Sequence, residues 1–135
     1  MFGFKKKENV EFEATRKFSD YLMYDENRNL IKIKGVKTPI AVEDIQLYQL
    51  KYGNKTYDRV DLGEAMVGGA LFGVLGIVMA GTHKDEYISN LTIMIKANDK
   101  FYSIPMIIGK MKVNLAKSIV SQAEQMIAFL DEITK

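Results

Sequence analysis

Asp58, Asp61 and Glu64 recur at steps of three in the stretch YDRVDLGE, so they would share one face if that stretch were helical. Carboxylate oxygens gathered in this way could hold a hard divalent cation. The alternative is that the three carboxylates are solvated charges in a loop, which is the interpretation we favour. No metal site is predicted from them.

The chain has one histidine, His83, and no cysteine. A two-histidine metal site, a thiolate site and a cysteine nucleophile are therefore excluded within one chain. The stretch GIVMAGTH has the Gly-x4-Gly spacing of a phosphate-binding loop, but Thr82 and His83 stand where that motif requires Lys and Ser or Thr. The serines lack the GxSxG context of a hydrolase nucleophile. We predict no catalytic residue and no cofactor.

The chain has 135 residues and a formal net charge of +2. That length suits one domain with an ordinary core, and the charge requires no polyphosphate partner. Lysines gather near Tyr48 and Tyr52, a mixture that nucleic-acid-binding surfaces use. Acidic residues are interspersed among them, so we interpret the lysines as a solvated sheet face and expect no nucleic acid partner. These lysines are Lys32, Lys34, Lys37, Lys51 and Lys55.

The first residues, MFGFKKKENVEFE, place lysines before polar and acidic residues rather than before an apolar run. This is not the pattern of a secretory signal, and the absence of cysteine fits a reducing compartment. We therefore expect a cytoplasmic protein in which residues 1–16 form a flexible basic segment. Residues 17–135 are predicted to form a single domain.

The first part of the domain predicts an antiparallel meander of about four strands. The runs KFSDYLMYD and LIKIKG flank the turn formers DENRN and indicate a hairpin. In the next run, Tyr48, Leu50 and Tyr52 share one face by a period of two. A turn and a short strand in YGNKTYDRV complete the meander.

The second part of the domain predicts another hairpin and then a helix. YISNLTIMIKA places Leu91, Ile93 and Ile95 on one face, and Pro105 in the following run FYSIPMII indicates an edge strand or a bulge. From Asn114 to Thr134 there is neither glycine nor proline, which favours an amphipathic helix with Asn114 as its N-cap. Its apolar stripe comprises Ala116, Ile119, Ala123, Met126, Ile127, Leu130 and Ile133.

Between these two parts lies a glycine-rich insert, residues 63–83, which carries no formal charge after Glu64. As one helix, Ala65–His83 would reach roughly 28 Å at about 1.5 Å per residue, close to the ~30 Å hydrocarbon thickness of a bilayer. A single crossing would separate the two groups of strands, and the second group could not form a good domain alone. We therefore expect the chain to leave and return on the same side, as a hairpin that turns at FGVLG.

The apolar residues of this hairpin must be covered by something. The candidates are the domain itself or a second copy of the chain, a different protein, the outer layer of a membrane, and a true span. The glycines would serve tight turns and close contact between the two arms. The predicted interaction residues are Val67, Leu71, Phe72, Val74, Leu75, Ile77, Val78 and Met79, and the predicted turn or close-packing residues are Gly68, Gly69, Gly73, Gly76 and Gly81.

A strand meander, a further strand pair and one C-terminal amphipathic helix resemble the pleckstrin-homology-like fold. The stretches YDENRNLIKIKG, VEDIQLYQL, GEAMVGGALFGVLGIVMAGT and LTIMIKANDKFYSIP resemble small proteins of Gram-positive bacteria and their phages that carry a similar insert. The resemblance spans residues 17–135 and implies an α+β fold, an antiparallel sheet or partly open barrel with one C-terminal helix. The more usual form has Arg or Lys early in the insert, where this chain has Glu64.

The resemblance implies a binding domain rather than an enzyme. Our first hypothesis is a non-enzymatic module that uses the insert against a protein partner. If the chain comes from a phage or mobile element, that partner would be a host defence protein. The alternative is a module at the inner face of the membrane, which inserts its apolar hairpin into lipid. Self-association through the insert is a further option.

Overall fold

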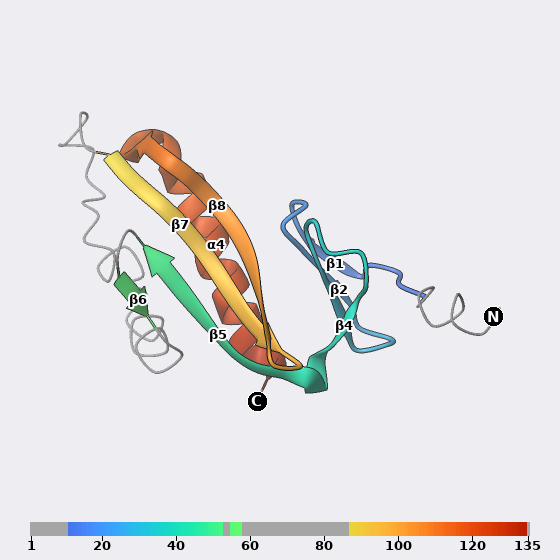
Figure 1. Cartoon of the computed structure of the whole chain (residues 1–135). Coiled ribbons are helices and arrows are strands. Elements are labelled where there is room, and N and C mark those ends of the chain that lie inside the picture. Colours follow the sequence, from blue (N-terminus) through green and yellow to red (C-terminus); the bar gives the residue numbers. More distant parts are fainter. Residues whose placement is uncertain (1–10, 53–54, 58–86, 135) are drawn as a thin grey trace.

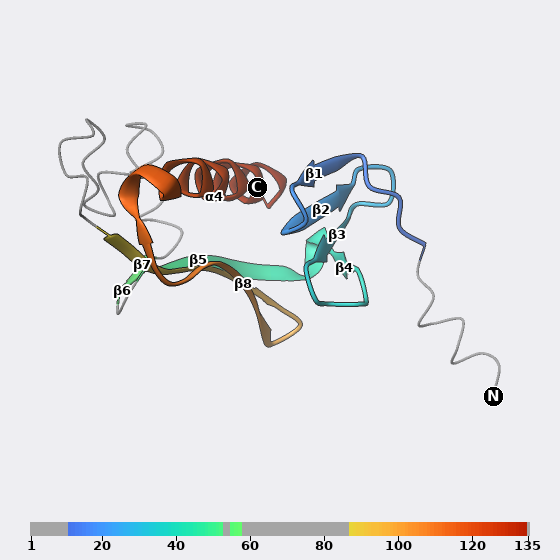
Figure 2. The ribbon, with the colours of Figure 1, turned by 90° about the horizontal axis from the view of Figure 1, so that it is seen from above.

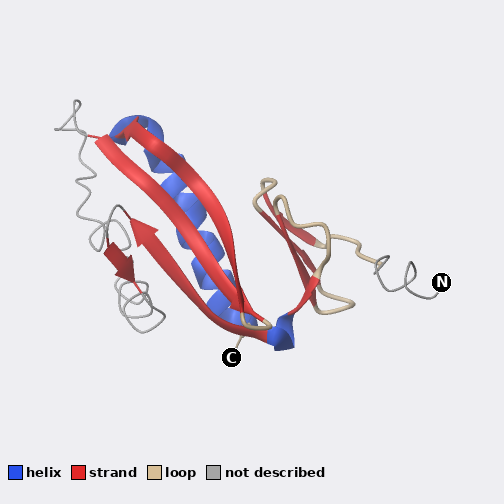
Figure 3. Ribbon diagram, in the orientation of Figure 1, coloured by secondary structure: helices blue, strands red, loops and turns tan. Residues whose placement is uncertain are grey.

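The computed structural model describes residues 11–52, 55–57 and 87–134 (Figure 1). These residues form two antiparallel sheets and one C-terminal helix, and the described strands do not close into a barrel (Figure 3). The predicted α+β class, with one C-terminal helix, is therefore confirmed. The insert 63–83, with all its predicted interaction and glycine residues, lies outside the described residues, as do His83 and the acidic residues of YDRVDLGE.

The first sheet has the strand order β1-β2-β3-β4. Its strands are β1 (Arg16–Phe18), β2 (Leu22–Asp25), β3 (Leu30–Ile33) and β4 (Ile40–Ala41). The predicted hairpin across DENRN is confirmed, because β2 pairs with β3 from Leu22↔Ile33 to Asp25↔Leu30. The run that begins KFSDY is not one strand, however, because it turns back on itself at Ser19, whose φ is 53°.

The second sheet has the strand order β6-β5-β7-β8. The short 3-10 helix η1 (Val42–Asp44) leads into β5 (Ile45–Tyr52), and β6 (Lys55–Tyr57) and β7 (Tyr87–Ala97) each lie antiparallel to β5. The strands β7 and β8 (Lys100–Lys112) are joined by a tight turn in which Asn98 and Asp99 both have positive φ, as a type I′ hairpin turn requires. β8 lies at the edge of the sheet, as Pro105 predicted.

The direct pairing of β5 with β7 decides the main architectural question. Tyr52 is opposite Leu91, and Ile45 is opposite Ala97. The strands before and after the insert therefore belong to one sheet, as we predicted. A single membrane crossing between them is incompatible with this pairing, because it would place hydrogen-bonded neighbours on opposite sides of the membrane.

The helix α4 (Val113–Ile133) covers one face of the second sheet, and its C-terminal end lies beside the first sheet (Figure 2). The predicted helix is confirmed, and its apolar stripe is buried except for Ile119 and Ile133, which are partly buried against the core. The predicted N-cap is wrong. The cap residue is Lys112, which makes no side-chain cap hydrogen bond, and Asn114 lies inside the first turn because β8 runs directly into the helix.

The core lies between the helix and the second sheet and extends to the first sheet. Leu91, Ile93 and Ile95 of β7 are completely buried, and so is Leu50 of β5, as their alternation predicted. The hydroxyl of Tyr48, also buried, donates a hydrogen bond of 3.0 Å to Asp131 Oδ1 and so ties β5 to the last turns of α4. Each fully buried aliphatic side chain contributes about 1.5–3 kcal/mol to folding, so this layer fixes the relative position of helix and sheet.

Candidate functional site

The face of the second sheet that points away from α4 is not covered by any described residue (Figure 2). Because side chains alternate along a strand, this face carries the neighbours of the buried residues. Its cross-strand rows follow from the register: Leu47, Lys96 and Phe101 form one row, Gln49, Met94 and Ser103 the next, and Lys51, Thr92 and Pro105 the third. We call this surface the open face.

Every charged residue in the strands of the second sheet is a lysine. Aspartate and glutamate are absent from these strands; among the described residues, Asp44 directly precedes β5 and Asp99 lies in the β7–β8 turn. That carboxylate is already bonded, because Asp99 Oδ1 accepts a hydrogen bond of 3.1 Å from Gln46 Nε2. The strands therefore give the open face and its edge a positive potential. By the register, the lysines on this side of the sheet are Lys51, Lys96, Lys110 and Lys112, whereas Lys100 pairs with buried Ala97.

Large apolar side chains are exposed beside these lysines. Phe101 is 54% exposed, Ile108 83% and Tyr87 53%. Phe101 lies under the ammonium group of Lys96, which is 5.5 Å from the ring centroid. Ile108 is turned outward where the β7–β8 ladder shifts register, next to Gly109, whose φ is 77°. The open face thus combines cations with exposed apolar groups.

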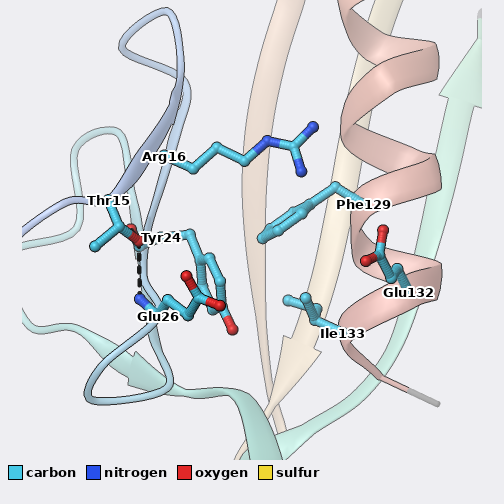
Figure 4. Close-up of a pocket in the computed structure, with 7 residues that line it drawn as sticks. All are labelled: Thr15, Arg16, Tyr24, Glu26, Phe129, Glu132 and Ile133. Atoms are coloured by element: carbon cyan, nitrogen blue, oxygen red, sulfur yellow. Dashed lines mark hydrogen bonds between the residues drawn. The ribbon is translucent and has the colours of Figure 1, made fainter.

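A second feature is a half-open cavity of about 260 Å³ between the first sheet and the C-terminal end of α4 (Figure 4). The first sheet contributes residues from β1, β2 and the positions next to them, and the helix contributes its last turns. The lining residues are Thr15, Arg16, Tyr24, Glu26, Phe129, Glu132 and Ile133.

Phe129 is the centre of an aromatic cluster at this cavity. Its ring centroid is 5.0 Å from that of Phe18 and 4.9 Å from that of Tyr24, which meets it edge to face. The guanidinium carbon of Arg16 is 4.8 Å from the Phe18 centroid and 5.0 Å from the Phe129 centroid. These contacts connect strands β1 and β2 to the helix, and they hold the cation of Arg16 in one place.

The three charged side chains that line the cavity are exposed and have no ionic partner in the described part of the chain. Arg16 contacts aromatic rings, and neither Glu26 nor Glu132 has a side-chain hydrogen bond or ion pair there. The backbone N–H of Glu26 is bonded, because it donates to Thr15 Oγ1 at 3.0 Å. The cavity therefore presents one cation and two carboxylates to whatever enters it.

Asp25, by contrast, is a fully satisfied buried carboxylate. It accepts hydrogen bonds from the backbone N–H groups of Glu13 (2.9 Å) and Arg28 (3.1 Å) and from Arg28 Nη1 (3.0 Å). Burial acts to raise the pKa of Asp25, but these hydrogen bonds and the charge of Arg28 outweigh it, so the pKa lies below its ordinary value of 3.8. The hydrogen bonds from Arg28 to Asp25 and Glu11 raise its own pKa. This network fastens the β2–β3 turn and residues 11–13, so its role is structural.

The lysines predicted to share one sheet face are divided between the two sheets. Lys32 lies on β3 and Lys34 and Lys37 follow it, whereas Lys51 lies on β5. Lys34 is engaged locally, with Asp20 at 3.3 Å and the Tyr21 ring at 5.5 Å. The open face is instead completed by lysines of β7 and β8. Arg16 and Phe129 were missed at the sequence level, because only the fold brings the two ends of the chain together.

Comparison with protein-family models, with curated proteins and with solved structures finds no match. Within the described residues, no helix combines the length and the apolar character that a membrane crossing needs.

Proposed function

We propose that the protein is a non-enzymatic interaction module that binds an acidic protein partner through its open face. The observation that carries this proposal is the composition of that face: lysines without a single acidic residue in the strands, beside exposed Phe101 and Ile108. Protein interfaces pair complementary potentials and place aromatic and aliphatic anchors at their centre.

The two kinds of residue would have different tasks. An exposed ion pair contributes only about 0.2–1 kcal/mol, so the lysines would mainly speed association and exclude basic partners. Phe101 and Ile108 would supply most of the affinity, because burying a large apolar side chain is worth about 1.5–3 kcal/mol. Binding should therefore weaken with salt without being abolished by it.

The insert is attached to this same sheet at both ends, since the chain leaves it after β6 and returns to it at β7. A partner bound to the open face would thus meet a sheet that also carries the uncharged segment. This supports the hypothesis that sheet and insert act together, in an architecture that we propose to be pleckstrin-homology-like.

An anionic membrane surface is the second candidate partner. The same lysines favour it, since each Lys near such a surface contributes about 1 kcal/mol, and exposed Ile108 and Phe101 could enter the interface. A sheet face with a few separate apolar anchors fits a protein surface better than lipid, so we place the protein partner first.

The test uses two variants with equal charge. The open-face variant carries Lys51→Glu, Lys96→Glu and Lys110→Glu, three positions that the register places on that face. The control variant carries Lys17→Glu, Lys32→Glu and Lys37→Glu, which lie on or next to the first sheet. In each variant three changes of −2 take the formal net charge from +2 to −4, so net charge alone cannot explain a difference.

A partner is first identified by crosslinking in cells of the native host and then purified for direct titration. We expect the control variant to bind it like the wild-type chain and the open-face variant to lose binding. Equal binding by both variants would refute the use of the open face. Flotation with phosphatidylserine vesicles is the second arm, and binding to vesicles without any protein partner would favour the membrane candidate.

A further inference from the structure

We propose that the cavity between the first sheet and the C-terminal end of α4 binds a small cationic zwitterion, a molecule with one carboxylate and one or two cationic groups. This site is separate from the open face and does not depend on the proposed function. The inference rests on the three unpaired charges that line the cavity and on the aromatic rings beside Arg16.

Arg16 is the group that would recognise the carboxylate. Its guanidinium lies over the rings of Phe18 and Phe129, at 4.8 and 5.0 Å from their centroids. Ring contacts fix the position of a guanidinium but leave N–H donors free, and its planar fork matches the two oxygens of a carboxylate. Arg28 of the same chain is different, because its guanidinium is already paired with the carboxylates of Asp25 and Glu11.

Glu26 and Glu132 would hold the cationic end of the ligand. They come from opposite walls, Glu26 from the end of β2 and Glu132 from the last turn of α4 (Figure 4). An ammonium or guanidinium group between them would form ion pairs with both carboxylates. The C-terminal end of a helix carries a negative partial charge, so the dipole of α4 favours a cation on this side of the cavity.

The rest of the lining suits the apolar middle of such a ligand. In Figure 4, the Phe129 ring lies below the Arg16 guanidinium, Tyr24 lies beside Glu26, and Ile133 lies below Phe129. The volume of about 260 Å³ is below the range typical of drug-sized ligands, about 300–1,000 Å³. It suits a ligand of the size of one amino acid. The lining charges, one positive and two negative, are complementary to those of L-arginine, which has one carboxylate and two cationic groups.

Titration of the full chain, followed by amide chemical shifts, tests this site with three probes. L-Arginine carries the complete charge pattern. Agmatine lacks the carboxylate, and L-citrulline lacks the guanidinium charge. We expect millimolar L-arginine to shift the amide signals of Arg16, Glu26 and Glu132. Because these three side chains are exposed, losing one ion pair should weaken binding by each analogue about two- to fivefold.

Variants assign each end of the ligand. Arg16→Gln should weaken L-arginine binding about two- to fivefold and leave agmatine binding unchanged, because agmatine has no carboxylate for Arg16 to bind. Glu132→Gln should weaken both. The matched control is Lys17→Gln, an exposed neighbour of Arg16 on the same strand. If Arg16→Gln fails to fold, Arg16→Lys keeps the charge without the fork and serves in its place.

Three results would overturn the proposal. The first is the absence of shifts at these residues with L-arginine. The second is agmatine binding as tightly as L-arginine, which would remove the role of Arg16. The third is an equal effect of Lys17→Gln and Arg16→Gln on L-arginine binding, which would show that binding depends only on the net charge of the protein.

Discussion

Replacing Phe129 by alanine should uncouple the first sheet from the helix. The side chain is 4% exposed and contacts Phe18, Tyr24 and the guanidinium of Arg16. Removal of a buried phenylalanine costs about 3–5 kcal/mol through lost transfer energy and the space left behind. The space at this position opens into the 260 Å³ cavity, so water can fill it and the expected loss lies near the lower end, about 3 kcal/mol.

Urea unfolding followed by circular dichroism measures this loss. A loss of about 3 kcal/mol is a large part of the ~5–15 kcal/mol stability of an ordinary domain, so the midpoint should fall clearly at an unchanged slope. Phe129→Leu should cost about 1–2 kcal/mol, because it keeps most of the volume but loses the ring pairs, each worth about 0.5–1.5 kcal/mol. Ile108→Ala is the control, since a residue that is 83% exposed should change stability by less than about 0.5 kcal/mol.

Hydrogen exchange locates the effect. Amides of β1 and β2 should exchange faster in Phe129→Ala than in the wild-type chain. Amides of β7 should remain the more protected group, because the β5–β7–β8 ladder does not involve this ring. A loss of less than about 1 kcal/mol, or equal deprotection of both sheets, would show that the aromatic cluster does not connect the first sheet to the helix.

Three further outcomes follow from single residues. The folded-state pKa of Asp25 is below its ordinary value of 3.8. The ionised carboxylate therefore stabilises the fold fully above pH 3.8, and this stabilisation is lost as the pH falls through the folded-state pKa. Unfolding measured across acidic pH should show the loss, and the Asp25→Asn variant should be less stable at neutral pH and less sensitive to acid. Ile93→Ala, at a completely buried position of β7, should cost about 2–5 kcal/mol in the same urea assay, and a smaller cost would mean that this layer is loosely packed. Gly109→Ala should cost about 1 kcal/mol although its Cβ would meet no atom within 4 Å, because the φ of +77° is unfavourable for any residue with a side chain; an unchanged midpoint would show that the backbone relaxes there.

Long periodic elements could be predicted from the sequence, because each residue in them repeats the same signal. The alternation of Leu91, Ile93 and Ile95 and the helical stripe that ends at Leu130 were both confirmed, since burial on one side requires such a pattern. Strands of two or three residues, such as Ile40–Ala41, contain too few positions to show a period, so β1 and β4 were not separated from their surroundings.

The candidate sites were less accessible to sequence reasoning. The open face depends on which lysines the strand order brings together, and Lys51 is joined by Lys96 through the pairing of β5 with β7, not by Lys32. Arg16 and Phe129 lie near opposite ends of the chain, and no local pattern links them. The cap at Asn114 failed for a related reason, since a strand that continues directly into a helix leaves no separate cap residue.

The positions of β6 and β7 set a minimum length for the segment that joins them. Both strands are antiparallel to β5 and flank it on its two sides, so they run parallel to each other. A tight turn cannot link parallel strands, and such a crossover needs about a dozen residues or more. The chain between Tyr57 and Tyr87 exceeds that minimum. Each doubling of a flexible connection costs only about 0.6 kcal/mol, so the surplus length is thermodynamically cheap and its composition is open to selection for purposes other than folding.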